Sequence, residues 1–267
     1  MISQNTFDFV DEFLKSPLDN LINGNFKAAN SGKVIEVENP SNKKTIATVA
    51  DGDELDIDLA VKSARFAFDN IWSKTKPNER QRLLLKLADL IETNAEKFAL
   101  LESMDVGMPV MAAKMGLLPH IIAGLRYNAG WATKLNGETR ETSLPGEWHT
   151  FTYREAIGVA GLITPWNVPL AIALNKMSAA LAAGCTIVLK PAEQTPLSAI
   201  YLGQLITEAG FPDGVVNIVN GLGINAGAAL VNHPLVDKIS FTGSTLVGKN
   251  IIAQAANTLK RTSMELG

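Results

Sequence analysis

The second half of the chain alternates short apolar runs with helical patterns, and this alternation limits the fold more than any other feature. The runs are rich in β-branched residues and span Gly158–Ile163, Thr186–Leu189, Val215–Val219 and Lys238–Phe241. Stretches with helical spacing follow these runs in turn, at Ala171–Ala183, Leu197–Ala209, Asn225–Val231 and Thr245–Ala256. Short apolar strands that alternate with helices are typical of a parallel, doubly wound sheet. We expect Arg261–Glu265 to add a fifth strand.

Helical patterns also dominate the first 136 residues. The first fifty predict a short helix, a loop rich in Gly and Asn, and a strand or hairpin around Lys33–Glu38 and Thr45–Val49. Beyond Asp53, apolar residues at spacings of three and four predict a helix with the stripe Leu55, Leu59, Ala60, Ala64, Ala67, Phe68 and Ile71. Three more helices are expected: one from Pro77, one over Ala95–Met104, and one over Met111–Leu135, kinked or split at Pro119 and capped by Gly137.

Residues 137–156 interrupt this helix-rich region. The segment is charged, contains the turn signal Pro145–Gly146, and alternates Trp148, Thr150, Thr152 and Arg154. We predict a two-stranded arm here. The whole expectation is therefore an α/β fold: a doubly wound parallel (Rossmann-like) sheet with an N-terminal helical region and an inserted β-hairpin arm.

Composition excludes several classes of protein. The net charge is −3, from 24 basic and 27 acidic residues, and no basic block suggests nucleic acid as a partner. Cys185 is the single cysteine and the histidines are scattered, so we expect neither disulfides nor a metal site. The N-terminus is too polar for a signal peptide, and no apolar window reaches the length of a membrane span. We expect a soluble, cytoplasmic protein with no membrane partner.

Residues that carry chemistry gather where the predicted strands end. The segments are Thr164–Asn167, Lys190–Glu193, Gly221–Gly223, Phe241–Ser244 and Glu265–Gly267. In doubly wound sheets, ligands bind outside the carboxyl ends of the strands, so these segments are expected to form one site. For any one of them taken alone, ordinary turn chemistry is the alternative interpretation.

Taken together, these segments resemble a known family. The runs GVAGLITPWNVP, AAGCTIVLKPAEQTP, FPDGVVNIVNG, FTGST and MELG resemble the aldehyde dehydrogenase superfamily in order and spacing. The earlier runs ERQRLLLKLADLIETNAEKFALLESMDVGMP and LRYNAGWATKLNG resemble its N-terminal, NAD-binding half. The resemblance covers the chain from about residue 20 onward.

The resemblance implies three catalytic residues. Asn167 would donate its side-chain amide to the oxyanion formed when a thiolate attacks an aldehyde. Glu265 would be the general base that activates the hydrolytic water, and Lys176 would help to relay its proton. In isolation, Asn167 is equally well explained as a helix cap, and Glu265 is better explained as an ordinary residue at a strand end.

The resemblance also implies NAD as the cofactor. Lys190 and Glu193 would hold the adenosine ribose, and the Glu193 carboxylate would repel a 2′-phosphate, which favours NAD over NADP. Gly243 and Ser244 would bind the pyrophosphate at a helix start. Gly221–Ala226 fits the pattern G-x-G-x-x-A, but in this family it resembles an adenine-side wall, so only Gly223 is retained. The remaining implied cofactor contacts are Ile163, Thr164, Pro165, Trp166, Phe241, Val247 and Leu266.

The family mechanism needs a nucleophilic cysteine a few tens of residues beyond the glutamate, and this chain ends two residues after Glu265. Cys185 precedes a strand, at the edge of the sheet away from the ligand, so we expect it to be structural. The expected domains are a cofactor-binding domain over 1–136 and 157–267 and an oligomerisation arm over 137–156, with the catalytic domain absent.

The resemblance thus implies NAD-dependent oxidation of an aldehyde to a carboxylic acid. The chain itself would be an inactive fragment that binds NAD and forms homo-oligomers. Two alternatives remain open: a non-catalytic NAD-binding or interaction module, and half of a coenzyme-A-acylating aldehyde dehydrogenase. Glu265 argues against the second, because a hydrolytic base is needed only when water is the acceptor.

Overall fold

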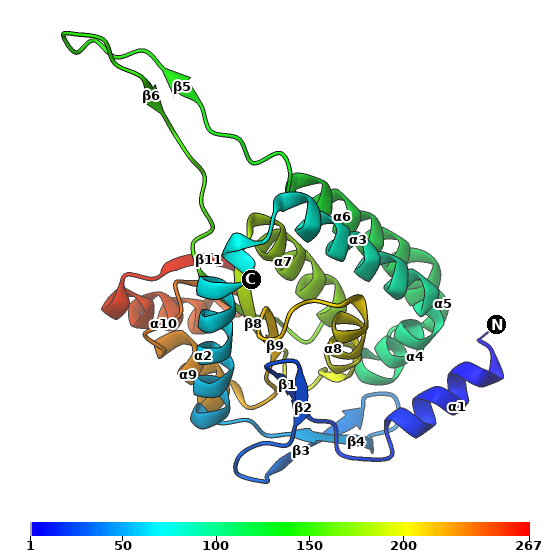
Figure 1. The fold of residues 1–267 in the computed structure, drawn as a ribbon. Helices are drawn as coiled ribbons and strands as arrows, with labels where there is room; N and C mark the ends of the chain where they lie inside the picture. Colours follow the sequence, from blue (N-terminus) through cyan, green and yellow to red (C-terminus); the bar gives the residue numbers. More distant parts are fainter. Residues whose placement is uncertain (1) are drawn as a thin grey trace.

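The computed structural model describes residues 2–267 (Figure 1). The strands are β1 (Asn20–Ile22), β2 (Asn25–Lys27), β3 (Val34–Asn39), β4 (Lys44–Ala50), β5 (Thr139–Arg140), β6 (Thr150–Phe151), β7 (Val159–Ile163), β8 (Thr186–Lys190), β9 (Val216–Ile218), β10 (Lys238–Gly243) and β11 (Arg261–Leu266). The α-helices are α1 (Gln4–Phe13), α2 (Glu54–Asn70), α3 (Pro77–Thr93), α4 (Ala95–Val106), α5 (Val110–Ala112), α6 (Leu118–Trp131), α7 (Pro169–Ala183), α8 (Leu197–Ala209), α9 (Ala228–Asn232) and α10 (Thr245–Ala255). Two π-helical turns are η2 (Ala113–Leu117) and η3 (Gly223–Gly227).

A seven-stranded sheet in the order β11-β10-β7-β8-β9-β1-β2 forms the centre of the molecule. The five strands predicted from the sequence, β7 to β11, are present and parallel to one another. The sheet is nevertheless mixed, because β1 and β2 add two antiparallel strands beside β9 in a region expected to be a loop. Asn23 and Gly24 connect β1 and β2, both with positive φ, as a tight hairpin turn requires.

Both faces of the sheet are covered, which explains the continuous apolar runs of its strands. Ala160 and Leu162 belong to a large core formed with α3, α4, α6, α7 and α8. Val159 and Ile163 point the opposite way, into a smaller core formed with α2, α9 and α10. Figure 1 shows this second group of helices on the far side of the sheet from α7 and α8.

The direction of winding reverses between β7 and β10. From β7 the chain passes to β8 and β9 through α7 and α8, and it then returns through α9 to β10 on the other side of β7. The loops that follow β7 and β10 therefore diverge to opposite faces of the sheet. In folds of this kind such a reversal opens a crevice at the carboxyl ends of the two strands.

The N-terminal helices depart from their predicted patterns in two places. Leu55 and Leu59 of α2 are exposed, and the buried face is Ile57, Ala60, Val61, Ala64 and Ala67. The buried set of residues fits helical spacing as well as the predicted set does. Packing of α2 against the sheet determines which of the two sets is buried. The predicted helix over Met111–Leu135 is split, with the turn η2 ending just before Pro119. It also ends early, at Trp131, so Gly137 is not its cap.

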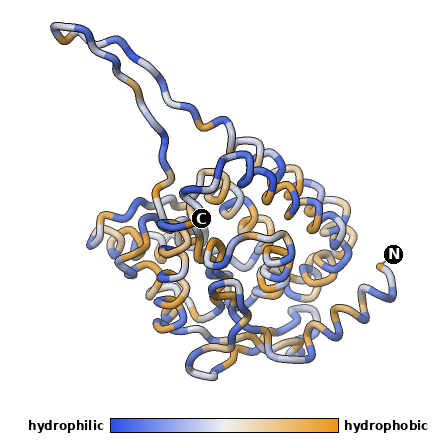
Figure 2. The backbone as a smooth tube through the Cα atoms, viewed as in Figure 1, coloured by the Kyte–Doolittle hydropathy of each residue, from blue (hydrophilic) through white to orange (hydrophobic). Residues whose placement is uncertain are grey.

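The predicted arm is present and projects away from the rest of the molecule (Figure 1). Thr139 pairs with Phe151 and Arg140 with Thr150, so the strands β5 and β6 are only two residues long. Nearly every arm residue is exposed, and Figure 2 shows long hydrophilic stretches along both limbs.

Among residues 2–267, no helix combines the length and the apolar character that crossing a membrane requires.

Candidate functional site

A cavity of about 700 Å³ lies at the reversal of the sheet, beside the loops that follow β7 and β10. Its walls also include the end of β8, η3, α9 and one side of α10. Of the twelve residues assigned to the cofactor from the sequence, eleven line this cavity: Ile163, Thr164, Pro165, Trp166, Lys190, Glu193, Gly223, Phe241, Gly243, Ser244 and Val247. The twelfth, Leu266, lies outside the lining. Its side chain packs against Gly248, because the pleat of β11 directs it onto α10.

Lys190 and Glu193 form an ion pair at the end of β8. The buried Lys190 amine is 2.9 Å from Glu193 Oε2 and 2.9 Å from the Pro191 carbonyl oxygen. Burial lowers the pKa of Lys190, whereas the carboxylate of Glu193 acts in the opposite direction. Burial raises the pKa of Glu193, but the charge and hydrogen bond of Lys190, together with backbone groups, outweigh it and bring that pKa below its usual value. Glu193 therefore presents a negative charge at the cavity wall.

The N-terminus of α10 faces the same cavity. Ser244 is the N-cap of this 11-residue helix, and its hydroxyl accepts a hydrogen bond from the Val247 N–H at 3.4 Å. The hydroxyl thus has the capping role that is ordinary for serine at a helix start. The first N–H groups of a helix have no partner within it and carry partial positive charge, so this end of the cavity suits an anion.

The loop between β7 and α7 carries Trp166 and Asn167 at the surface. Trp166 is 60% exposed and lines the cavity, and Asn167 beside it is exposed but does not line it. Thr164 is buried at the base of the loop, and its hydroxyl has no hydrogen-bond partner within residues 2–267. The Asn167 amide is therefore available to solvent in this loop.

Glu265 and Lys176 meet on the other face of the sheet. The Lys176 amine extends from α7 and lies 3.4 Å from Glu265 Oε1 on β11 and 2.9 Å from Ser240 Oγ on β10. The hydroxyl of Thr242 is 3.3 Å from Glu265 Oε2, so both carboxylate oxygens have a partner. Lys176 and Glu265 line a groove of about 430 Å³ between α7 and the strands β10 and β11.

Cys185 is buried in the large core and lines the far end of this groove, next to the first residue of β8. Burial raises the pKa of its thiol, which disfavours the thiolate. The structure thus places Cys185 at the amino end of the strands, as predicted, and away from Glu193 and Ser244 at the carboxyl ends.

One wall of the cavity, the side of α10, was not predicted from the sequence. Asn250, Ile251 and Gln254 line it together with Val247. Their positions are three, four and seven residues beyond Val247, which is the spacing of one helix face. Once Val247 is assigned to the cavity, this spacing is the signal that identifies the others.

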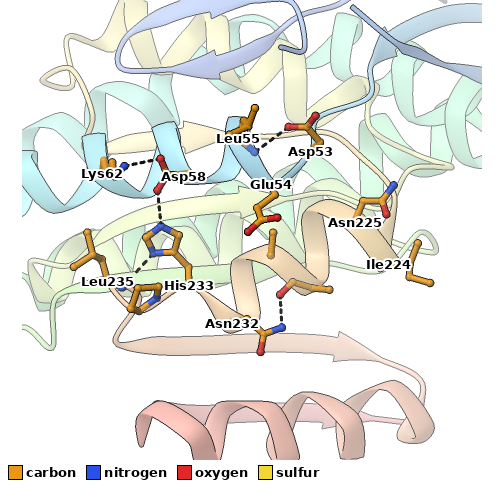
Figure 3. A pocket seen from close by; sticks show the side chains of 13 residues that line it. Asp53, Glu54, Leu55, Asp58, Lys62, Ile224, Asn225, Asn232, His233 and Leu235 are labelled. Carbon is orange, nitrogen blue, oxygen red and sulfur yellow. Dashed lines mark hydrogen bonds and ion pairs between the residues drawn. The ribbon is translucent and has the colours of Figure 1, made fainter. Parts of the chain in front are cut away.

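A larger cavity, of about 860 Å³, lies elsewhere, between α2 and α9 (Figure 3). Three of its polar groups, Asp58, Lys62 and His233, are paired with one another. The Leu235 N–H donates to His233 Nδ1, so Nε2 carries the ring proton and donates to Asp58, which also pairs with Lys62. None of the residues assigned a function from the sequence lines this cavity. Ile224 and Ala228 line both cavities, so α9 and η3 separate them.

Comparison with known proteins matches residues 26–267 to the aldehyde dehydrogenase family. An aldehyde dehydrogenase of Emericella nidulans is 48% identical over 254 residues, which are 95% of this chain and 50% of the relative. Aldehyde dehydrogenase 1A1 of Gallus gallus is 50% identical over 249 residues, covering 92% of this chain and 48% of the relative. The NAD+ complex of an aldehyde dehydrogenase from Bacillus cereus superposes with a TM-score of 0.94 at 47% identity, covering 97% of this chain and 52% of that chain.

The chain thus spans about half the length of these relatives. The family match extends over nearly all the described residues and includes both the cavity at the reversal of the sheet and the pair formed by Lys176 and Glu265. The chain belongs to the aldehyde dehydrogenase family.

Proposed function

We propose that this chain is the NAD-binding part of an enzyme that oxidises an aldehyde to a carboxylic acid. The observation that carries the proposal is the charged Glu193 carboxylate, anchored by the buried Lys190 amine at the wall of the 700 Å³ cavity. A solved relative with 47% identity is an NAD+ complex, which supports the same assignment.

The residues around the cavity fit the parts of NAD. Glu193 can accept hydrogen bonds from the two ribose hydroxyls, and its charge opposes a 2′-phosphate. The N-terminus of α10, with Gly243 and Ser244, can bind the pyrophosphate. The apolar side chains of Ile163, Phe241 and Val247 can contact ring systems, and Gly223 leaves open space beside Glu193.

When bound, the nicotinamide supplies an acceptor for the hydride that leaves the substrate. Asn167 can donate its amide to the oxygen on which negative charge develops. Glu265 can take a proton from an attacking water, because its carboxylate is 63% exposed while Thr242 and Lys176 hydrogen-bond to its two oxygens. Lys176 can then share that proton through its contact with Glu265.

The reaction also needs a nucleophilic cysteine, and this chain has none at the carboxyl ends of the strands. Its only cysteine, Cys185, is buried with a raised pKa at the amino end of the sheet. We therefore infer that this chain binds NAD without turning over an aldehyde by itself, and that the complete activity requires a cysteine from outside these residues. Homo-oligomers formed through the arm are part of the same proposal.

Titration calorimetry with NAD and NADP tests the proposal. We expect NAD to bind at least tenfold more tightly than NADP, about 1.4 kcal/mol, because Glu193 repels the 2′-phosphate. Glu193→Gln should weaken NAD binding and reduce the preference. Glu208→Gln, the same change at an exposed glutamate on α8, is the matched control and should leave both affinities unchanged. Equal affinities for NAD and NADP would contradict the role of Glu193, and failure to bind NAD would contradict the proposed function.

A further inference from the structure

Ser240 is the partner that lies nearest to the Lys176 amine. Its hydroxyl oxygen is 2.9 Å from Nζ, compared with 3.4 Å for Glu265 Oε1. Ser240 lies in the middle of β10, paired with Leu162 of β7 on one side and Ser263 of β11 on the other. Neither the composition nor the family resemblance predicted a functional role for Ser240.

The two partners of the amine differ in how firmly they are held. Ser240 is buried on a strand that has neighbours on both sides. Its side chain is short, and rotation about one bond, Cα–Cβ, sets the position of the hydroxyl oxygen. Glu265 lies on the edge strand β11 with a longer side chain that is 63% exposed. The exposed carboxylate has room to adopt other orientations, whereas the buried hydroxyl remains where β10 places it.

We propose that Ser240 is a positioning residue: its hydroxyl fixes the Lys176 amine beside Glu265 and keeps it there while the carboxylate changes orientation. The proposal rests on the proposed role of Glu265 as the base. Without Ser240, the amine of a side chain that is only 4% exposed would have Glu265 as its one hydrogen-bonding partner among the described residues, and would move with it.

The charges around Lys176 make the contact measurable. Burial lowers the pKa of Lys176, the charge and hydrogen bond of Glu265 raise it, and the charge of Lys238 on β10 lowers it. Glu155, Cys185 and Arg261 are the other titratable groups that line the same groove. An acceptor oxygen at 2.9 Å stabilises the ammonium form, so removal of the Ser240 hydroxyl should lower the Lys176 pKa further.

NMR titration of the lysine side-chain carbons in the whole chain, without cofactor or aldehyde, measures this pKa directly. The Lys176 resonance is assigned by its loss in Lys176→Met. We expect Ser240→Ala to lower the Lys176 pKa by about 1, because a hydrogen bond to a charged group is worth roughly that much. Ser240→Thr keeps the hydroxyl and should restore the original value. Ser263→Ala is the matched control, since Ser263 lies directly across from Ser240 on β11 and accepts no hydrogen bond from Lys176.

A Lys176 pKa that is equally unchanged in Ser240→Ala and Ser263→Ala would overturn the proposal. A second measurement does not depend on the folding of Ser240→Ala. In Glu265→Gln, nuclear Overhauser contacts between the Lys176 ε-protons and the Ser240 β-protons should persist, and their loss would also overturn it. Because neither measurement uses NAD, failure of the cofactor assignment would appear only in the calorimetry and remain distinguishable.

Discussion

Glu102 on α4 is a buried carboxyl group that the proposed chemistry does not use. Burial raises its pKa to about 7, against smaller opposite effects of the Ser198 hydroxyl and the Leu170 backbone. Neither of its oxygens reaches a partner in hydrogen-bonding geometry within residues 2–267. Asp105, one turn further along α4, is also buried, and its pKa is raised as well. Near neutral pH, the native state therefore retains protons that the unfolded chain releases.

This proton uptake should make stability fall as pH rises. Between the ordinary pKa of Glu102, near 4.5, and about 7, the folded state binds more protons than the unfolded state, so the free energy of unfolding decreases with pH. Glu102→Gln removes this dependence. Relative to wild type, the variant should gain on the order of 2 kcal/mol between pH 5 and pH 8. Urea unfolding at the two pH values measures the gain, and Glu208→Gln should show none. A Glu102→Gln variant whose stability difference from wild type is the same at both pH values would contradict the prediction.

At the residue scale, the sequence predicted the location of the site residues better than it predicted the contacts between their side chains. Lys190, Glu193 and Ser244 could be placed at one edge because the carboxyl ends of parallel strands meet there. The contact between Ser240 and Lys176 joins residues 64 positions apart, and it exists only because α7 packs over β10. The direction of Leu266 depends on the pleat of β11, which could be known only once its pairing with β10 was established.

Among the elements, the alternation of strands and helices was enough to predict the five parallel strands. The hairpin of β1 and β2 was missed because its strands are only three residues long and show no period. The dipeptide Asn23–Gly24 was nevertheless a signal for a tight hairpin turn. The buried stripe of α2 was wrong at Leu55 and Leu59, because helical spacing allows two overlapping stripes and only packing selects one.

The connection between β9 and η3 contains two glycines with different requirements. Gly221 has φ +146°, and a Cβ there would lie 2.4 Å from the Gly52 carbonyl oxygen. Gly223, two residues later, has open space around the same position. Gly221→Ala should therefore lower the free energy of unfolding by about 2 kcal/mol or more through strain and collision. Gly223→Ala should change it little. Urea unfolding of both variants measures the two changes. Comparable losses in the free energy of unfolding at the two positions would contradict the prediction.

For the whole molecule, the exposed surfaces predict self-association. The strand β11 forms one edge of the seven-stranded sheet, with no neighbour on its outer side within residues 2–267. The arm exposes Trp148, Phe151 and Tyr153. Unpaired strand edges and exposed apolar side chains are ready sites for pairing with a second copy. Charged residues on the arm, such as Arg140 and Glu147, should limit open-ended stacking.

We expect light scattering across a concentration series to give a dimer or a larger assembly. The triple variant Trp148→Ser, Phe151→Ser and Tyr153→Ser separates the two surfaces, because it should weaken association through the arm and leave association through β11 intact. A mass near 28.6 kDa at high concentration would show that the chain remains a monomer, and the prediction would then be wrong.

The position of β1 in the sheet has a consequence for folding during synthesis. Leu21 pairs with Ile218, and the side-chain oxygen of Asn20 accepts a hydrogen bond from the N–H of Asn220, 200 positions later. At a synthesis rate of about 5–20 residues per second, β1 must wait roughly 10–40 s after its synthesis for its neighbour β9. Leu21, buried in the finished sheet, can pair with Phe26 of β2 at once but remains without its β9 partner Ile218 throughout that interval. The strand β1 is thus synthesised long before its place in the seven-stranded sheet is complete, and we expect chaperones to bind it during this delay.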